Sequence, residues 1–192
     1  MESGLTKNDV RKKLLKLRDD FKQKQELQFS VINNFTHFSE SFLKPGDVIA
    51  CYYPIASELN IHPVFPLLHQ QYLKIALPVI EDESTINFSL WAPEEKMVYS
   101  KYATKILEPL NKNMLEEIPA VIIAPLIACD YHGNRIGSGK GYYDRKISQL
   151  RLETKKLIYV GLCYDFQIVE FPVENHDQKL NIIITETKII VI

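Results

Sequence analysis

The apolar run Val121-Ile122-Ile123-Ala124-Pro125-Leu126 stands shortly before a glycine-rich segment, Asp130-Tyr131-His132-Gly133-Asn134-Arg135-Ile136-Gly137-Ser138-Gly139-Lys140-Gly141-Tyr142-Tyr143-Asp144-Arg145. The run has the length and composition of a buried strand. The segment after it holds four glycines, three cations and two carboxylates. Glycines let backbone N–H groups approach an anion, and Lys or Arg supplies positive charge. The pattern therefore predicts a phosphate-binding loop at the end of a strand.

This loop differs from two common nucleotide-binding motifs. A Walker A loop places four residues between its glycines and Ser or Thr after its lysine, whereas here five residues separate Gly133 from Gly139 and Gly141 follows Lys140. The dinucleotide motif Gly-x-Gly-x-x-Gly also fails, because the spacing is Gly137-x-Gly139-x-Gly141. The alternative is a surface turn between a strand and a helix. A plain turn does not need so many charged and aromatic side chains.

Hydrophobic periodicity outlines the remaining elements. Thr6 is a candidate N-cap for a helix over about residues 7–27, and a helical stripe continues to Phe42 and stops at Pro45-Gly46. A further helix should contain Phe65, Leu68 and Tyr72. Strands are expected at 48–53, 74–77, 86–91, 121–126, 157–162 and 182–185, with an edge strand at 188–191. We expect loop with short helical pieces over residues 92–119.

The order of these elements predicts the fold class. Strand, helix and strand in succession favour parallel pairing, while the short link before 86–91 favours an antiparallel strand there. We therefore expect a three-layer α/β/α sandwich with a largely parallel, Rossmann-like sheet, forming a single domain over residues 1–192. Ligands of such sheets gather at the carboxyl ends of the strands, where the glycine-rich segment should lie.

Composition narrows the functional classes. The 192 residues carry a net charge of −1, which indicates neither a nucleic-acid partner nor an anionic membrane. Cys51, Cys129 and Cys163 stand in apolar runs and fit buried thiols of a reducing compartment. Neither a signal-peptide pattern nor an apolar stretch long enough to span a membrane is present. We expect a cytoplasmic, monomeric protein.

Residues 125–130 and 133–145 together resemble the signature of the 5-formyltetrahydrofolate cyclo-ligases, also called methenyltetrahydrofolate synthetases. Further matches follow the family's order: Lys7, Arg11, Ser57-Glu58, Leu77-Pro78, Trp91, Glu108-Pro109, and Asp177 ahead of Ile183-Ile184-Thr185-Glu186. The resemblance spans nearly the whole chain. It implies ATP-dependent conversion of 5-formyltetrahydrofolate to 5,10-methenyltetrahydrofolate, with release of ADP and phosphate and with Mg²⁺ as cofactor.

Two loop cations are candidate catalytic residues. Lys140 stands between glycines, so its ammonium could reach a transferring phosphoryl group, and Arg135 could clamp phosphate oxygens. Each could instead be an ordinary surface cation. Asp144 could be a helix-dipole partner or a magnesium ligand, and the residues alone do not decide. The resemblance favours magnesium and adds Asp177 as a second ligand, although Asn181 stands where relatives often carry another acid.

The resemblance also implies nucleotide contacts. Lys7 and Arg11 share one helix face, but the pattern alone favours a solvated basic face, because Lys12, Lys13, Lys16 and Arg18 are basic too. The family match assigns the first two to ATP. The full predicted ATP-binding set is Lys7, Arg11, Arg135, Gly137, Ser138, Gly139, Lys140, Gly141, Tyr142 and Tyr143.

Folate contacts are predicted for Tyr53, Glu58, Trp91 and Tyr142. The matching family residue of Glu58 accepts hydrogen bonds from the pterin ring, while the alternative is a carboxylate at a helix N-terminus beside Ser57. Ile61 stands where relatives often carry Thr. Trp91 and Tyr142 could stack on folate rings, although such residues are more often core. No role follows from the histidine spacing.

The implied chemistry needs no protein nucleophile. The formyl oxygen must be phosphorylated by ATP before N10 can close on the carbon and displace phosphate. A sugar-phosphate isomerase or a CoA transferase on a similar scaffold is an alternative that would need a general base or a catalytic glutamate. A non-catalytic folate- or nucleotide-binding protein is a further alternative.

Overall fold

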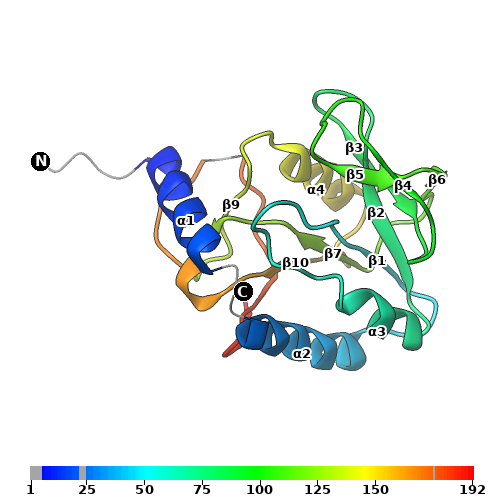
Figure 1. Ribbon diagram of the computed structural model, residues 1–192, viewed down its shortest axis with the longest axis horizontal. Helices are drawn as coiled ribbons and strands as arrows, with labels where there is room; N and C mark the ends of the chain where they lie inside the picture. Colours follow the sequence, from blue (N-terminus) through cyan, green and yellow to red (C-terminus); the bar gives the residue numbers. More distant parts are fainter. Residues whose placement is uncertain (1–5, 22–24, 175) are drawn as a thin grey trace, which may run out of the picture.

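An eight-stranded sheet forms the centre of the computed structural model, which describes residues 6–21, 25–174 and 176–192 (Figure 1). The strand order is β12-β11-β10-β7-β1-β2-β3-β6. The bounds are β1 (Val48–Ala50), β2 (Lys74–Ile80), β3 (Ile86–Leu90), β6 (Asn113–Met114), β7 (Val121–Ala124), β10 (Ile158–Leu162), β11 (Ile182–Ile184) and β12 (Ile189–Val191). Strands β11, β10, β7, β1 and β2 pair in parallel, and β12, β3 and β6 are antiparallel. The largely parallel sheet and the antiparallel pairing of β3 are confirmed.

Helices cover both faces of this sheet. They are α1 (Lys7–Phe21), α2 (Gln25–Phe42), α3 (Val64–Gln70) and α4 (Tyr142–Glu153), and a 3₁₀ turn covers Asp165–Gln167. Figure 1 shows α2 and α3 on one face and α4 on the other. Successive β7 side chains alternate between these layers, since Ile123 packs in the α2/α3 core and Ile122 packs in the core that contains Ile147 of α4. This alternation confirms the three-layer arrangement.

Helix α1 belongs to a third, smaller core. A hairpin is formed by β8 (Ala128–Cys129) and β9 (Arg135–Ile136). Val10 and Leu14 pack with Ile136 of β9 and with Ile127, which directly precedes β8. The predicted N-cap is confirmed, because Thr6 and Asp9 exchange hydrogen bonds between their backbone N–H groups and side-chain oxygens at 3.0 and 3.2 Å. The packing places α1 beside the carboxyl ends of the parallel strands.

Several predicted boundaries were wrong. The first helix ends at Phe21 rather than at residue 27, and the next begins at Gln25, with residues 22–24 outside the described part. Strand β1 stops at Ala50. Tyr72 follows α3 with a φ of 58°, so it is a turn residue exposed to solvent. Apolar periodicity locates an element, but only hydrogen bonding fixes its ends.

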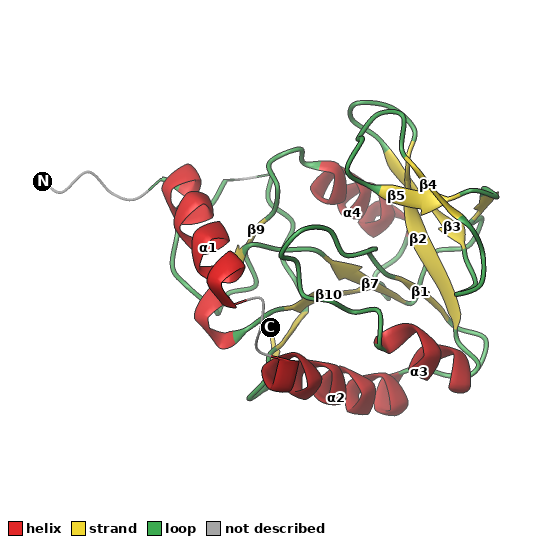
Figure 2. Ribbon diagram, in the orientation of Figure 1, coloured by secondary structure: helices red, strands yellow, loops and turns green. Residues whose placement is uncertain are grey.

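The prediction of loop and helical pieces over residues 92–119 was also wrong. Two paired strands, β4 (Met97–Tyr99) and β5 (Leu107–Pro109), lie here beside the β2–β3 end of the sheet (Figure 2). Their mixed polarity hides them in the sequence, because β5 contains a buried glutamate. Glu108 accepts the Ile80 N–H at 3.1 Å and pairs with Lys112 at 3.1 Å. These two partners satisfy the buried carboxylate, and both lie outside β5.

The three cysteines are buried free thiols, as predicted. The Sγ atoms of Cys129 and Cys163 lie 3.7 Å apart. Within the described residues, every helix is too short or too polar to cross a membrane.

The turn between β8 and β9 gives Gly133 a structural role. Gly133 has a φ of +83°, and a Cβ there would stand 2.6 Å from the Leu180 carbonyl oxygen. Its own carbonyl accepts the Leu180 N–H at 2.7 Å, so the backbones cannot separate without losing this bond. Gly133 is therefore required for a close backbone contact rather than for anion binding.

We expect Gly133→Ala to lower the free energy of unfolding by about 2–3 kcal/mol, because it combines left-handed strain with a backbone clash. Gly46→Ala is the matched control: its φ is +93°, but nothing lies within 4 Å of the added Cβ. It should cost only about 1 kcal/mol. Urea unfolding measures both, and equal losses would contradict the proposed clash.

Candidate functional site

A cavity of about 430 Å³ lies at the carboxyl ends of β1 and β7. Its walls come from α1, from the segments that follow the two strands, from the glycine-rich segment and from Glu174, His176 and Asp177. Most predicted site residues line it: Lys7, Arg11, Tyr53, Glu58, Arg135, Gly137, Ser138, Gly139, Gly141, Tyr142, Tyr143, Asp144 and Asp177. Lys140 and Trp91 are not among the lining residues. The cavity is therefore at the sheet edge where the sequence predicts it.

The glycine-rich segment closes over the cavity before α4 begins. Gly141 has a φ of +69° and precedes the first helical residue, Tyr142. Arg11 donates from Nε to the Gly137 carbonyl oxygen at 3.0 Å, which ties α1 to the segment. The N-terminus of α4 thus lies at the cavity, where unpaired N–H groups and the helix dipole favour an anion.

Lys140 is exposed on this segment. Its carbonyl oxygen accepts a hydrogen bond from Arg145 at 2.8 Å. Among the described residues, its ammonium has neither a hydrogen-bond acceptor nor an ion-pair partner. The backbone at Lys140 is held in place while its side chain is free, and its predicted role stays a prediction.

Arg135 is held deep in the wall. Its side chain is 4% exposed and donates to Asp144 Oδ2 at 3.0 Å. The guanidinium also lies against the rings of Tyr143 and Tyr159, 5.7 and 5.6 Å from their centroids. The other Asp144 oxygen accepts the backbone N–H of Gln178 at 3.2 Å. These contacts fix both Arg135 and Asp144 toward the cavity.

A second group of ion pairs involves Lys7 of α1. Lys7 Nζ lies 2.5 Å from Asp177 and 3.0 Å from Glu174. Burial alone would lower the pKa of Lys7, but the two hydrogen-bonded carboxylates raise it above its usual value. Burial alone would raise the pKa of Asp177, but its hydrogen bond with Lys7 brings it below its usual value. Both groups are therefore charged at neutral pH.

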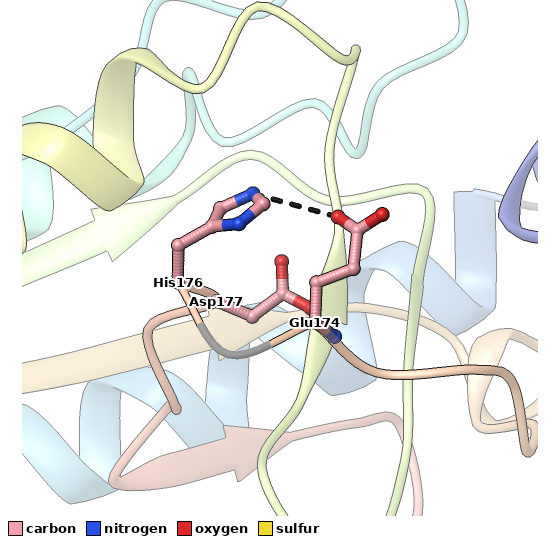
Figure 3. Close-up of side chains that lie close together, drawn as sticks. All are labelled: Glu174, His176 and Asp177. Atoms are coloured by element: carbon pink, nitrogen blue, oxygen red, sulfur yellow. Dashed lines mark hydrogen bonds and ion pairs between the residues drawn. The ribbon is translucent and has the colours of Figure 1, made fainter.

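His176 joins this acidic group, although the histidine spacing assigned it no role. Figure 3 shows Glu174, His176 and Asp177 together, and His176 Nε2 lies 3.4 Å from Glu174. One donor atom of each lies within 4.8 Å of the others. Such a grouping on a loop has no regular sequence spacing that could have revealed it.

The two predicted metal ligands offer chemically suitable donors. Asp144 and Asp177 both line the cavity with carboxylate oxygens, which magnesium prefers. Gln178, next to Asp177 in the chain, donates to Asp144 and so brings the two segments together. The donor set fits a hard divalent cation.

Glu58 lies half-buried in the loop between β1 and α3. It accepts the Ile55 N–H at 3.0 Å. The alternative role at a helix N-terminus does not hold, because α3 begins six residues later at Val64. Burial raises the pKa of Glu58, although the Ile55 hydrogen bond and the charge of Arg18 oppose this rise.

Trp91 is placed in the hydrophobic core. Its ring packs edge-on against Phe65 at 5.2 Å and Tyr53 at 6.3 Å between centroids. Its Nε1 donates to the Glu95 carbonyl oxygen at 3.4 Å. Tyr53 lines the cavity while Trp91 lies behind it, so folate stacking by Trp91 stays a prediction.

Arg18 is the residue that the sequence reasoning missed. Lys12, Lys13 and Lys16 are exposed as a solvated basic face predicts, but Arg18 is 5% exposed and lines the cavity. Its spacing was informative, because Arg18 falls on the same helix face as Arg11, seven residues earlier.

Comparisons with known proteins agree with this geometry. Residues 4–186 match the model of the 5-formyltetrahydrofolate cyclo-ligase family. The 5-formyltetrahydrofolate cyclo-ligase of Escherichia coli K12 is 31% identical over 148 residues, which cover 73% of this chain and 79% of the relative. The enzyme of the same name from Haemophilus influenzae is 27% identical over 91% of this chain and 94% of its own.

Two solved structures share the fold. The 5,10-methenyltetrahydrofolate synthetase of Mycoplasma pneumoniae aligns with a TM-score of 0.74 at 26% identity, over 95% of this chain and 99% of that chain. The synthetase of the same name from Aquifex aeolicus aligns with a TM-score of 0.79 at 28% identity, over 97% and 93%.

The buried ion pair in the cavity wall should matter for stability. Asp144→Ala leaves the Arg135 guanidinium in its buried place without a carboxylate, so we expect a loss of about 2–4 kcal/mol in unfolding free energy. Glu117→Ala removes an exposed pair with Lys74 and should cost about 0–1 kcal/mol. Chemical denaturation compares the two variants, and similar small losses would mean that Arg135 needs no anionic partner.

Proposed function

We propose, on the premise that the chain belongs to the 5-formyltetrahydrofolate cyclo-ligase family, that its cavity binds magnesium-ATP and 5-formyltetrahydrofolate together. In this cavity 5-formyltetrahydrofolate is converted to 5,10-methenyltetrahydrofolate, and ATP yields ADP and phosphate. One observation carries the proposal: a cationic, glycine-lined wall and a half-buried carboxylate, Glu58, face the same cavity. The first suits a polyphosphate and the second suits a ring with N–H donors. A phosphoryl transfer between two such ligands requires them to share one space.

The nucleotide would occupy the wall formed by α1 and the start of α4. Lys7, Arg11 and Arg135 supply positive charge there, and the lining residues of the glycine-rich segment supply backbone close to the ligand: Gly137, Ser138, Gly139 and Gly141. Tyr143 supports this assignment, since its hydroxyl is buried without a partner among the described residues. A bound ligand would satisfy that hydroxyl.

Asp144 and Asp177 would hold the magnesium ion. When bound, the ion supplies charge that neutralises the phosphate oxygens. The carboxylates currently pair with Arg135 and Lys7. Lys7 and Arg135 would then lie beside the metal-binding carboxylates, where their charges favour the anionic nucleotide.

The folate would lie on the Glu58 side. An ionised carboxylate accepts two hydrogen bonds, which matches adjacent N–H donors on a pterin ring. Tyr53 and Tyr142 also line the cavity and offer ring surfaces. Trp91 would support Tyr53 from behind.

The residues act by position and charge. The formyl oxygen attacks the γ-phosphorus and the bond to ADP breaks, after which N10 attacks the formyl carbon and phosphate leaves. Arg135 and Lys140 would stabilise charge on the transferring phosphoryl group. Glu58 would hold the pterin so that N10 can reach the carbon.

We also propose that residues 1–192 work as a single domain, as a monomer in the cytoplasm, with small-molecule substrates and without a nucleic-acid or membrane partner. The three buried free thiols support a reducing compartment. The balanced net charge of −1 supports the absence of a polyanionic partner.

Turnover tests the proposal directly. Purified protein with magnesium-ATP and 5-formyltetrahydrofolate should produce the ultraviolet absorbance of the methenyl product, together with ADP. Lys140→Ala should reduce kcat about a hundredfold, as loss of a charge-stabilising group does. Lys156→Ala, an exposed lysine beyond α4, is the control and should leave kcat unchanged. Binding of both ligands without product would favour the non-catalytic alternative.

Folate recognition by Glu58 is tested separately. Glu58→Ala leaves the pterin donors without an acceptor, which costs about 1–3 kcal/mol, so 5-formyltetrahydrofolate should bind roughly tenfold more weakly. ATP affinity should stay nearly unchanged. Calorimetry measures both, with the exposed Glu26→Ala as control. Unchanged folate affinity would place the pterin elsewhere.

A further inference from the structure

Arg18 is a buried cation at the cavity whose contacts join three separate segments. It extends from the last turn of α1 and is 5% exposed. Its Nε donates to Ser57 Oγ at 3.2 Å, and its Nη1 donates to the Leu126 carbonyl oxygen at 3.0 Å. Ser57 precedes Glu58 in the loop after β1, and Leu126 follows β7 just before the β8–β9 hairpin. One side chain therefore connects α1, the Glu58 loop and the strand end that leads to the glycine-rich segment.

The positive charge of Arg18 has no direct counter-ion. Among the described residues, no carboxylate oxygen lies within 4.0 Å of its nitrogens, and both of its hydrogen-bond acceptors, Ser57 Oγ and the Leu126 carbonyl oxygen, are neutral. The acid that interacts with it most strongly is Glu58. Burying a guanidinium without an ion-pair partner is costly, and the favourable interaction with the charge of Glu58 offsets part of that cost.

Glu58 has few charged or titratable neighbours. Arg18 faces it from α1, Tyr52 from the segment after β1, and Tyr143 from α4. Within the described part of the chain, Arg18 is the cation whose charge favours the ionised form of this carboxylate. The two tyrosines are neutral near pH 7 because burial raises the pKa of each hydroxyl.

We propose that Arg18 is the positioning residue for the folate end of the reaction: its two hydrogen bonds fix the Glu58 loop relative to the end of β7, and its charge favours the ionised form of Glu58. This role rests on the proposed function, in which ionised Glu58 accepts hydrogen bonds from the pterin ring.

The charge and the hydrogen bonds of Arg18 should affect the pH dependence of folate affinity in different ways. Burial raises the pKa of Glu58 and the Arg18 charge opposes that rise. A protonated Glu58 loses acceptor capacity, so folate affinity falls as the pH drops through the pKa of this group. Removing the charge of Arg18 should move this loss of folate affinity to higher pH. Removing the hydrogen bonds instead lowers affinity by the same factor at every pH.

The experiment measures 5-formyltetrahydrofolate affinity of the full chain by calorimetry between pH 4.5 and 8. Arg18→Gln keeps hydrogen-bond donors but removes the charge, so the midpoint of the affinity loss should rise by about one pH unit or more. Arg18→Lys keeps the charge but cannot donate to Ser57 and Leu126 in the same fork, so it should bind several-fold more weakly with the wild-type midpoint. Lys16→Gln removes an exposed charge from the same helix and should match the wild type.

Protonation of the free ligand changes with pH in the same way for every variant, so it cancels when the variants are compared. An unmoved midpoint in folded Arg18→Gln would overturn the charge role, and wild-type affinity in Arg18→Lys would overturn the bonding role. Thermal unfolding establishes that each variant is folded. If Arg18→Gln does not fold, Ser57→Ala decides: weaker binding with an unchanged midpoint supports the bonding role, and unchanged binding overturns it.

The Glu58→Gln variant distinguishes a failure of the proposed function from a failure of the role of Arg18. Glu58→Gln should weaken folate binding and abolish the pH midpoint that Glu58 causes. If Glu58→Gln binds folate like the wild type, Glu58 is not the pterin acceptor, and the folate assignment fails whatever the Arg18 variants do. If Glu58→Gln weakens binding while the Arg18 variants match the wild type, only the role of Arg18 is wrong.

Discussion

The packing of Val10 and Leu14 on the β8–β9 hairpin is the contact on which the whole cavity depends. This small core is separate from the two that fill the sheet faces. It holds α1 across the carboxyl edge of the sheet, so that Lys7, Arg11 and Arg18 form one wall of the cavity. This apolar contact favours docking of a helix whose other basic residues, Lys12, Lys13 and Lys16, are exposed to water.

Charge compensation is the second constraint on the site. Lys7 is paired with Asp177 and Arg135 with Asp144, while Arg11 and Arg18 bind backbone carbonyl groups. The cations are therefore positioned before any ligand arrives, which lowers the reorganisation that binding requires. Under the proposed function, the cations would contact the anionic nucleotide and the neighbouring carboxylates Asp144 and Asp177 would hold the metal ion. The two charges are thus expected to enter together as a magnesium-nucleotide complex.

The sequence predicted the sheet and the position of the cavity because both depend on local signals. Apolar runs mark the parallel strands, and glycines with cations mark the loop after β7. The β4–β5 pair escaped prediction because buried Glu108 is satisfied by Ile80 and Lys112, which no strand pattern can reveal. Arg18 escaped for a related reason. The basic neighbours of Arg18 indicate a solvated face and outweigh the spacing that places Arg18 on the same helix face as Arg11. Its hydrogen bond to the Leu126 carbonyl group then belongs to a buried side chain.

Lys140 and Arg135 illustrate two ways of supplying charge to a reacting group. Arg135 is fixed by Asp144 and two aromatic rings, so it can stabilise charge only where the ligand meets it. Lys140 has a backbone anchored by Arg145 through its carbonyl, and among the described residues its ammonium has no partner to give up. Moving it onto a ligand costs side-chain entropy but no ion pair. Its exposed position outside the cavity wall therefore agrees with a group that engages the phosphoryl only after both substrates are bound.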